Sequence, residues 1–252
     1  MIVVTIFFTT SAVYWAGIAP AQRARLADKS SDVATGTVIR IPGSRTTIHE
    51  LHSTVDPTSQ WVVVSKQFAL ADPAYRPADL SRVTVATRVD KSDDELSLKK
   101  FIQPDLVAMF TAAHEQGFPI MVASGFRSYG QQQAYFDSYT ATYGLEKAET
   151  FSAHPGQSEH QTGLALDIAN TDMNDCYLDI CFGEAPAGKW LAAHAHEYGF
   201  ILRYPADKTK ITRYQYEPWH FRYVGKPLAT AIYQSGLTLD EVKPYLEKSQ
   251  TK

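Results

Sequence analysis

The sequence contains very little cysteine. Of its 252 residues only two are cysteines, Cys176 and Cys181, and they lie close together. Two thiols exclude a zinc site built from four cysteines of one chain. Their short spacing favours a disulfide that closes a small loop, which suits an oxidising compartment. Two reduced cysteines, or half of a metal site, are the alternatives.

A surplus of positive charge is also missing. The chain has 24 lysines and arginines against 27 aspartates and glutamates, a net charge of −3. Nucleic-acid binding therefore has no electrostatic support, and we expect no nucleic acid among the partners. Internal repeats and low-complexity tracts are absent from the sequence as well. With 44% hydrophobic and 20% charged residues, the composition is that of a globular protein.

Charge is absent from the N-terminal stretch. Residues 2–19 are uncharged and largely apolar, a length typical of a signal-peptide core or a short membrane span. Ala19-Pro20-Ala21 weakly resembles a cleavage site. No lysine or arginine precedes the stretch and several follow it, the reverse of an ordinary signal. A buried apolar helix is the alternative, which the lack of a polar face disfavours.

Shifts in composition divide the chain into four segments. After the apolar start comes a polar, mixed stretch with turn signals, for which we expect a spacer with a short hairpin around Gly43. The apolar run at 61–65 indicates a strand and the beginning of a folded unit. The predicted organisation is a signal peptide or membrane anchor at 1–21, a spacer at 22–58, the main domain at 59–236 and a C-terminal helix at 237–252.

Hydrophobic periodicity predicts helices mixed with short strands. Ser128 and Thr238 are suited to cap the helices that follow them, Thr238 with Glu241 as a capping box. The order of elements indicates an α+β fold in which a small antiparallel sheet has helices packed around it. Helices are expected at 104–116, 129–143, 189–198 and after Thr238, and strands at 118–123, 163–168, 200–203 and 219–223.

Two histidines and two carboxylates provide the parts of a hydrolytic metal site. Alternation along 163–168 sets Asp167 opposite a fully aliphatic face, so this carboxylate must point to solvent, a partner or a metal. With His160 and His220 it gives three ligands that suit a catalytic Zn²⁺ with one position open for water. Glu217, three residues before His220, is free to act as the base for that water. The competing interpretation is that all four are ordinary structural residues.

Arg127 lies where a predicted strand gives way to a predicted helix, a junction that often projects side chains toward a site. A fixed guanidinium there can stabilise an oxyanion or clamp a substrate carboxylate. A solvated surface arginine is the alternative. The remaining histidines have no evident partners for a metal site and are expected to be structural or on the surface: His49, His52, His114, His154, His194 and His196.

Three motifs together resemble one family. The run SEHQTGLALD at 158–167 is similar to the SxHxxGxAxD signature of a zinc peptidase superfamily, which includes lysostaphin-type enzymes, D-Ala-D-Ala carboxypeptidases and the hedgehog signalling domain. With EPWH at 217–220 and SGFRSY at 124–129, the sequence resembles the VanY-type D-alanyl-D-alanine carboxypeptidases of peptidase family M15. The resemblance covers about residues 61–227 and implies a hedgehog/D-Ala-D-Ala-peptidase-like fold.

The resemblance also implies a reaction and a set of roles. The reaction is removal of the C-terminal D-Ala from peptidoglycan stem peptides, outside the cytoplasmic membrane in the cell envelope, by a protein expected to be a monomer. LD-carboxypeptidase action on tetrapeptide stems, or a non-catalytic zinc-binding cell-wall module, are the alternatives. The implied roles are zinc ligands His160, Asp167 and His220, catalytic base Glu217, and substrate contacts Arg127, Gln132 and Ser158.

Overall fold

The computed structural model describes residues 38–172 and 176–249 of the chain. The predicted signal peptide or anchor at 1–21 lies outside the described residues, as does the spacer up to residue 37. Within the described part of the chain, no helix has the length and apolarity to cross a membrane.

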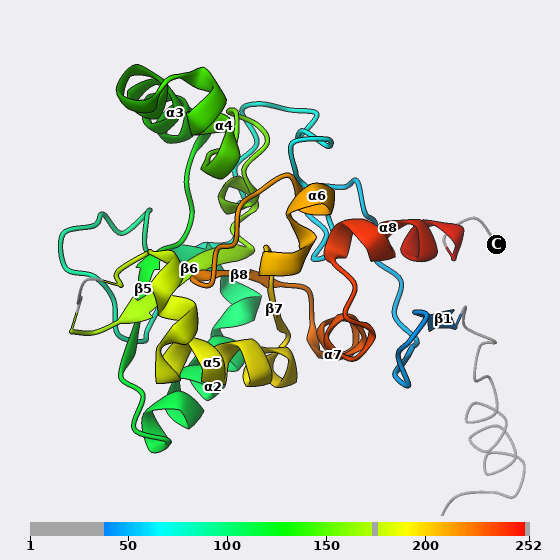
Figure 1. The fold of residues 1–252 in the computed structure, drawn as a ribbon. Coiled ribbons are helices and arrows are strands. Elements are labelled where there is room, and N and C mark those ends of the chain that lie inside the picture. Colours follow the sequence, from blue (N-terminus) through cyan, green and yellow to red (C-terminus); the bar gives the residue numbers. More distant parts are fainter. Residues whose placement is uncertain (1–37, 173–175, 250–252) are drawn as a thin grey trace, which may run out of the picture. The chain divides into compact units, whose positions relative to one another are not determined.

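A four-stranded antiparallel sheet forms the centre of the fold, as the α+β prediction requires (Figure 1). Its register sets Asp167 opposite Ser124 on one neighbouring strand and opposite His220 on the other. The two strands that carry predicted metal ligands are therefore direct neighbours. In sheet order the strands are β5 (Ile120–Ser124), β6 (Ala165–Asn170), β8 (His220–Tyr223) and β7 (Phe200–Leu202).

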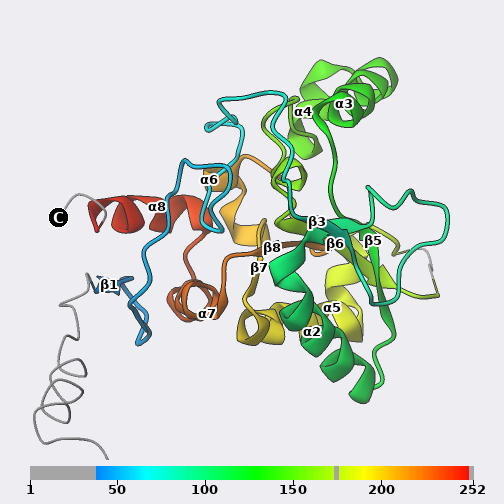
Figure 2. The ribbon, with the colours of Figure 1, turned by 180° about the vertical axis from the view of Figure 1, so that it is seen from behind.

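The two faces of this sheet have different neighbours. Helices α2 (Gln103–Glu115) and α5 (Pro186–His194) lie on one side, whereas α3 (Tyr129–Tyr143) and α4 (Leu145–Phe151) lie on the other, in both views (Figures 1 and 2). The face toward α2 and α5 is covered by apolar side chains. Its core joins aliphatic side chains of β6 and of the residue before it to the apolar stripe of α2: Leu164, Leu166, Ile168, Leu106, Met109, Phe110 and Ala113.

Helix boundaries follow the sequence signals closely. Helix α3 begins after Ser128, whose hydroxyl accepts a hydrogen bond from the backbone N–H of Gln131 in a capping box. The same motif at Thr238 opens α8 (Leu239–Lys248). Instead of the single helix predicted at 189–198, the structure has α5 followed by a short 3-10 helix, η4 (Ala195–Tyr198). This 3-10 helix ends at Gly199, which is in the left-handed conformation.

A second hydrophobic cluster lies beyond the edge strand β7. It contains Ile39 and Ile48 from the hairpin of β1 (Ile39–Arg40) and β2 (Thr47–Ile48), which turns at Gly43 as predicted. The hairpin packs with α7 (Lys226–Ser235) and α8. The described part of the predicted 22–58 spacer therefore contributes buried side chains to the folded unit.

The strand predicted at 61–65 is wrong. Trp61 and the valines that follow are buried, but the segment has no strand partner apart from one isolated bridge at Ser65. A side chain takes the place of a neighbouring strand, because the Arg222 guanidinium donates to the backbone carbonyl of Val62 at 2.6 Å. An apolar run alone cannot distinguish these two environments.

The remaining elements are short and connect the larger ones. They are β3 (Leu80–Arg82), β4 (Ser97–Lys99), η1 (Lys100–Ile102), η2 (Glu159–Thr162), η3 (Ile180–Glu184), η5 (Ala206–Lys208) and α6 (Thr209–Thr212).

The structure joins Cys176 to Cys181 in a disulfide, so the loop after β6 is closed covalently.

Candidate metal centre

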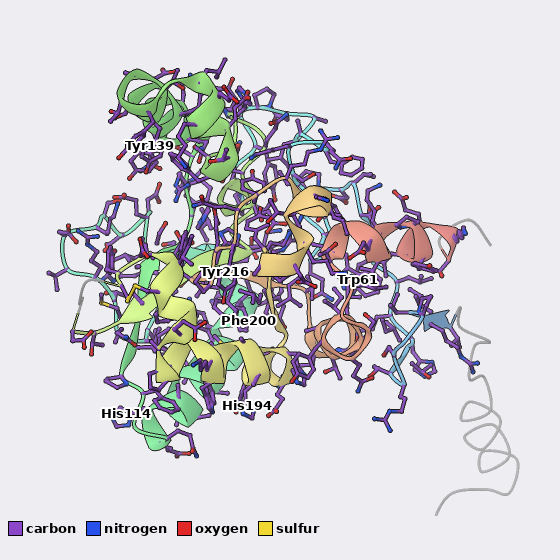
Figure 3. The ribbon with its side chains drawn as sticks, in the orientation of Figure 1. Trp61, His114, Tyr139, His194, Phe200 and Tyr216 are labelled. Atoms are coloured by element: carbon purple, nitrogen blue, oxygen red, sulfur yellow. A yellow bond between two sulfur atoms is a disulfide. The ribbon has the colours of Figure 1, made fainter. Side chains whose placement is uncertain are left out.

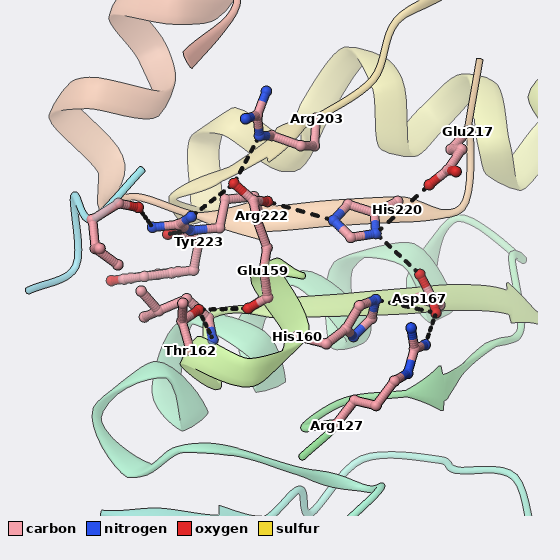
Figure 4. Close-up of polar contacts among 12 residues, drawn as sticks. Arg127, Glu159, His160, Thr162, Asp167, Arg203, Glu217, His220, Arg222 and Tyr223 are labelled. Carbon is pink, nitrogen blue, oxygen red and sulfur yellow. Dashed lines mark hydrogen bonds and ion pairs between the residues drawn. The ribbon is translucent and has the colours of Figure 1, made fainter. Parts of the chain in front are cut away.

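The three predicted ligands meet at one point. His160 comes from η2, Asp167 from β6 and His220 from β8, and their potential ligand atoms lie within 4.8 Å of one another. His160 Nε2 is 3.5 Å from Asp167 Oδ2, and His220 Nδ1 is 3.3 Å from Asp167 Oδ1. Figure 4 shows the two rings converging on the carboxylate. Across residues 38–172 and 176–249, this is the one group of three such residues with metal-binding geometry.

The local sequence explains how His160 reaches Asp167. Gly163 ends η2 in the left-handed conformation at φ 67°, which turns the chain from η2 into β6. A Cβ at this position would meet Leu80 Cδ2 at 2.9 Å, so space as well as backbone angle favours glycine. Alternation along β6 then directs Asp167 away from the aliphatic core and toward the histidines.

Each imidazole has a second contact that orients it. His160 Nδ1 donates a hydrogen bond to the carbonyl of Gly125 at 2.6 Å, which leaves the lone pair of Nε2 available to bind a metal. His220 Nε2 faces Glu159 Oε2 at 3.5 Å, which leaves Nδ1 facing Asp167. Partners of this kind set the tautomer and ring orientation of metal-binding histidines.

The residues present fit a zinc ion. Asp167 Oδ1 is buried and has no hydrogen-bond partner among the described residues, an arrangement that is costly unless a cation compensates it. Two imidazole nitrogens and one carboxylate are a ligand set of catalytic zinc sites, which keep a fourth position open.

Buried charges shift the pKa values of the ligands. Burial acts against ionisation of Asp167, yet the neighbouring His160 and His220 hold its pKa well below the usual range. Burial acts to lower the pKa of His220, but the neighbouring carboxylates of Asp167 and Glu159 outweigh it and raise the pKa to about 9. The pKa of His160 is lowered, chiefly by burial. Without a metal, His220 is therefore the imidazole that carries the extra proton.

Glu217 lies next to the ligands without joining them. Its Oε2 is 3.9 Å from His220 Nδ1, and its backbone N–H donates to the carbonyl of Tyr204 at 3.1 Å. Burial raises the pKa of Glu217 to about 8, with a further contribution from the charge of Asp167. A carboxyl group with a pKa near neutrality can both accept and release a proton.

Arg127 lies on the other side of Asp167, with Nη2 at 3.8 Å from Asp167 Oδ2. Its Nη1 donates to Gln132 Oε1 at 3.0 Å. Gln132 is only 1% exposed, and its amide nitrogen donates to the carbonyl of Ala153 at 2.8 Å. Gln132 thus holds Arg127 in place. The third predicted substrate contact, Ser158, directly precedes η2, and its side chain does not cap that helix.

These residues line one cavity of about 590 Å³. The ligands, Glu217 and Arg127 form part of its lining, together with Gln132 and Ser158. Aromatic side chains of α3 and α4 line it as well, as does the loop closed by the disulfide. The contributions from these elements are Tyr139, Tyr143, Lys147, Phe151, Leu178, Asp179 and Ile180.

The sequence analysis missed the residues behind His220. Glu159 is fully buried between Arg203 and Arg222, and it directly precedes His160 in the signature run. Arg222 shares the alternation face of His220, which is the one signal that could have identified it. By contrast, His114 and His194, expected to be structural or on the surface, lie on the far side of the sheet from Tyr139 (Figure 3).

A buried site of two histidines and one aspartate, with a free carboxylate and an arginine beside it, defines a mononuclear zinc hydrolase. The sequence model of the family described as VanY, D-alanyl-D-alanine carboxypeptidase, matches residues 95–226. The chain belongs to this family. Its cofactor is Zn²⁺.

Known proteins agree with this assignment. The putative carboxypeptidase YodJ of Bacillus subtilis (strain 168) is 42% identical over 202 residues, which are 79% of this chain and 71% of that protein. The structure of the LdcB LD-carboxypeptidase matches with a TM-score of 0.70 and 41% identity, over 77% of this chain and 88% of that one.

Two structures of VanY proteins are also similar. VanYB in complex with D-alanine-D-alanine has a TM-score of 0.60 and 36% identity, over 71% of this chain and 94% of that one. A variant of VanY from the VanB-type resistance cassette, in complex with Zn(II), has a TM-score of 0.56 and 35% identity, over 71% and 96%.

Proposed function

We propose that this chain is a zinc-dependent D-alanyl-D-alanine carboxypeptidase that removes the C-terminal D-Ala from peptidoglycan stem peptides. The observation that carries the proposal is the arrangement of Glu217 and Arg127 on either side of a two-histidine, one-aspartate site within one cavity. The substrate class is supported by similarity to VanYB, whose structure holds D-alanine-D-alanine.

His160, Asp167 and His220 hold the zinc ion. Zinc, when bound by these residues, supplies a Lewis acid that polarises the scissile carbonyl and lowers the pKa of a water molecule. Glu217 takes a proton from the attacking water and delivers it to the leaving amine of D-Ala. Because Glu217 lies beside the ligands without being one of them, its carboxylate is free for both halves of this transfer.

Arg127 recognises the terminal carboxylate of the substrate or the developing oxyanion. A guanidinium fixed by Gln132 can make charge-assisted hydrogen bonds to either group without first losing conformational freedom. Ser158 lines the cavity as a substrate contact. It is not a nucleophile, because His160 cannot act as its base while bound to the metal.

A stem-peptide assay tests the proposal. Purified protein is incubated with pentapeptide and tetrapeptide stems, with and without a zinc chelator, and released D-Ala is measured. We expect release from the pentapeptide that stops with chelator and returns with zinc. Release from the tetrapeptide alone would overturn the D-alanyl-D-alanine assignment.

LD-carboxypeptidase activity is the second candidate because LdcB is similar over most of this chain. The two activities use the same zinc chemistry and differ in the residue that precedes the scissile bond. The cavity walls around that residue decide between them. The ratio of kcat/KM for the two stems measures the preference directly.

A non-catalytic zinc-binding module is the remaining alternative, and Glu217 argues against it. A buried carboxylate with a raised pKa beside the ligands costs stability and has no evident use in metal binding alone. We expect Glu217→Gln to bind zinc like the wild type and to lose activity by about 10²–10⁴-fold. Inductively coupled plasma analysis and the pentapeptide assay measure the two properties, and full activity in this variant would remove Glu217 from the mechanism.

The cellular setting is part of the same proposal. Residues 1–21 act as a signal peptide or membrane anchor and 59–236 as the catalytic domain followed by the 237–252 helix. Of the segment at 22–58 predicted as a spacer, the part from residue 38 packs with the catalytic domain. The enzyme works as a monomer on the outer side of the cytoplasmic membrane. Cell fractionation and light scattering of the purified chain test location and oligomeric state.

A further inference from the structure

We propose that Glu159 is a positioning residue for the zinc ligand His220, and that Arg203 and Arg222 hold Glu159 in the required orientation. The inference rests on the proposed function in one respect, the role of His220 as a ligand. It goes beyond that function because it assigns a role to a buried cluster that takes no part in the chemistry itself.

The two oxygens of Glu159 have different partners. Oε1 accepts hydrogen bonds from Arg203 Nε at 2.8 Å and from Arg222 Nη1 at 2.9 Å. Oε2 lies 3.5 Å from His220 Nε2 (Figure 4). The arginines therefore fix the plane of the carboxylate and leave its second oxygen directed at the imidazole.

Oε2 of Glu159 and Nε2 of His220 depend on each other. Both atoms are buried, and neither has a hydrogen bond to any other described residue. Two complementary groups that are shielded from water and face each other gain from pairing, because each otherwise loses its solvation without compensation. A small rotation of either side chain would bring Nε2 and Oε2, now 3.5 Å apart, to hydrogen-bond distance.

The cluster is formally neutral and joined by several hydrogen bonds. Arg203 Nη1 donates to Asp240 Oδ2 of α8 at 2.6 Å, so the two guanidinium groups face two carboxylates. Arg222 Nη2 donates to the carbonyls of Val62 and Gln60 at 2.6 and 3.1 Å. The position of Glu159 is thereby determined by Arg203, which directly follows β7, and by β8, α8 and the segment at 60–62.

Stability alone does not account for this cluster. Well-packed apolar side chains of the same volume stabilise a core as well as buried ion pairs do, and often better. The arrangement is explained by its contact with His220. A carboxylate that accepts from the remote nitrogen of a ligand histidine fixes the tautomer and strengthens the nitrogen that faces the metal, and losing it typically reduces metal affinity about 10–100-fold.

The test compares zinc binding by the full-length wild-type chain and Glu159→Gln. Zinc affinity is measured by competition with a chromophoric chelator, and the visible absorption spectrum of the Co²⁺-substituted protein reports ligand geometry. We expect the zinc dissociation constant of Glu159→Gln to rise about 10–100-fold and the Co²⁺ spectrum to change. Glu149→Gln is the matched control, because Glu149 contacts His154 at 2.8 Å on the surface, and it should leave both measurements unchanged.

A second variant covers the case in which Glu159→Gln fails to fold. Glu159→Asp keeps the charge between the two arginines but withdraws the carboxylate from His220 by one methylene. It should also weaken zinc binding and change the Co²⁺ spectrum, with circular dichroism like the wild type. Wild-type zinc affinity and spectrum in a folded Glu159 variant would overturn the proposal.

His220→Ala separates this inference from the proposed function. If His220→Ala loses zinc while the Glu159 variants bind it normally, the metal site stands and the positioning role fails. If His220→Ala retains wild-type zinc affinity, the assignment of the ligand itself fails.

Discussion

At the residue scale, buried Gln132 has a contact that the sequence did not indicate. Its predicted role as a substrate contact stays a prediction, and in the structure its amide oxygen accepts from Arg127 while its amide nitrogen donates to Ala153. The guanidinium is therefore held in advance of substrate binding. An arginine fixed in this way presents a planar fork that matches a carboxylate, which a lysine cannot reproduce.

We expect Arg127→Lys to raise KM for a pentapeptide stem about 10–100-fold, because charge-assisted hydrogen bonds are lost. Steady-state kinetics on the free acid and on the C-terminal amide of the same peptide measure the effect. The wild type should strongly prefer the acid, and the variant should lose most of that preference. An unchanged preference would mean that Arg127 does not recognise the carboxylate.

The raised pKa of His220 predicts that zinc binding releases protons. Its pKa of about 9 means that the imidazole is protonated at pH 7 in the metal-free protein, whereas a ligand must be neutral. Zinc affinity should therefore increase with pH between about 6.5 and 9 and level off above that range. Calorimetry in two buffers of different ionisation enthalpy measures the release, expected to be about one proton or more at pH 7. No buffer dependence would contradict the prediction.

At the scale of elements, the disulfide loop acquires a role that the sequence did not indicate. Leu178, Asp179 and Ile180 line the same cavity as the metal ligands, on the loop between Cys176 and Cys181. Asp179 also accepts a hydrogen bond from the backbone N–H of Cys181 at 3.2 Å, which holds the start of η3. The disulfide therefore closes a loop that forms part of the wall of the cavity around the metal site.

We expect the double variant Cys176→Ser, Cys181→Ser to raise KM several-fold while zinc content and the Co²⁺ spectrum stay unchanged. The loop contributes no ligand, so its loosening should affect substrate binding and leave the metal alone. Kinetics on the pentapeptide and metal analysis distinguish the two effects. A loss of zinc, or an unchanged KM, would show that the loop does not act as a wall.

Helices, caps and strand faces were predictable from the sequence where they depend only on neighbouring residues. The face of α2, the cap at Ser128 and the alternation that exposes Asp167 to the site follow from local periodicity and local hydrogen bonds. The wrong strand at 61–65 and the missed Glu159 have a common cause. In both, the deciding partner is Arg222, which is distant in the sequence. Alternation places Arg222 on the face of His220 but does not say which carbonyl or carboxylate it contacts.

At the scale of the whole molecule, the metal site joins segments that are far apart in the chain. Its three ligands come from η2, β6 and β8, and the cluster behind them reaches α8. A ligand that binds only when all these segments are in place stabilises the folded state by mass action.

Chelation should therefore lower the melting temperature. At a free zinc concentration one hundred times the dissociation constant, binding contributes about 2.7 kcal/mol. For a domain of this size that corresponds to a shift of roughly 5–10 °C. Differential scanning calorimetry with and without chelator measures it, and His220→Ala should show no zinc-dependent shift. An equal shift in that variant would place the stabilising zinc elsewhere.

The register between β6 and β8 sets Asp167 opposite His220, so zinc can bind only to chains in which these two strands are paired correctly. A slip of one residue between β6 and β8 would turn His220 toward the aliphatic face and remove the third ligand. Such a chain would also turn Phe221 and Tyr223 out of the apolar core, so packing disfavours it as well. Because the metal binds only the correct pairing, zinc present during refolding would draw mispaired chains toward the native register.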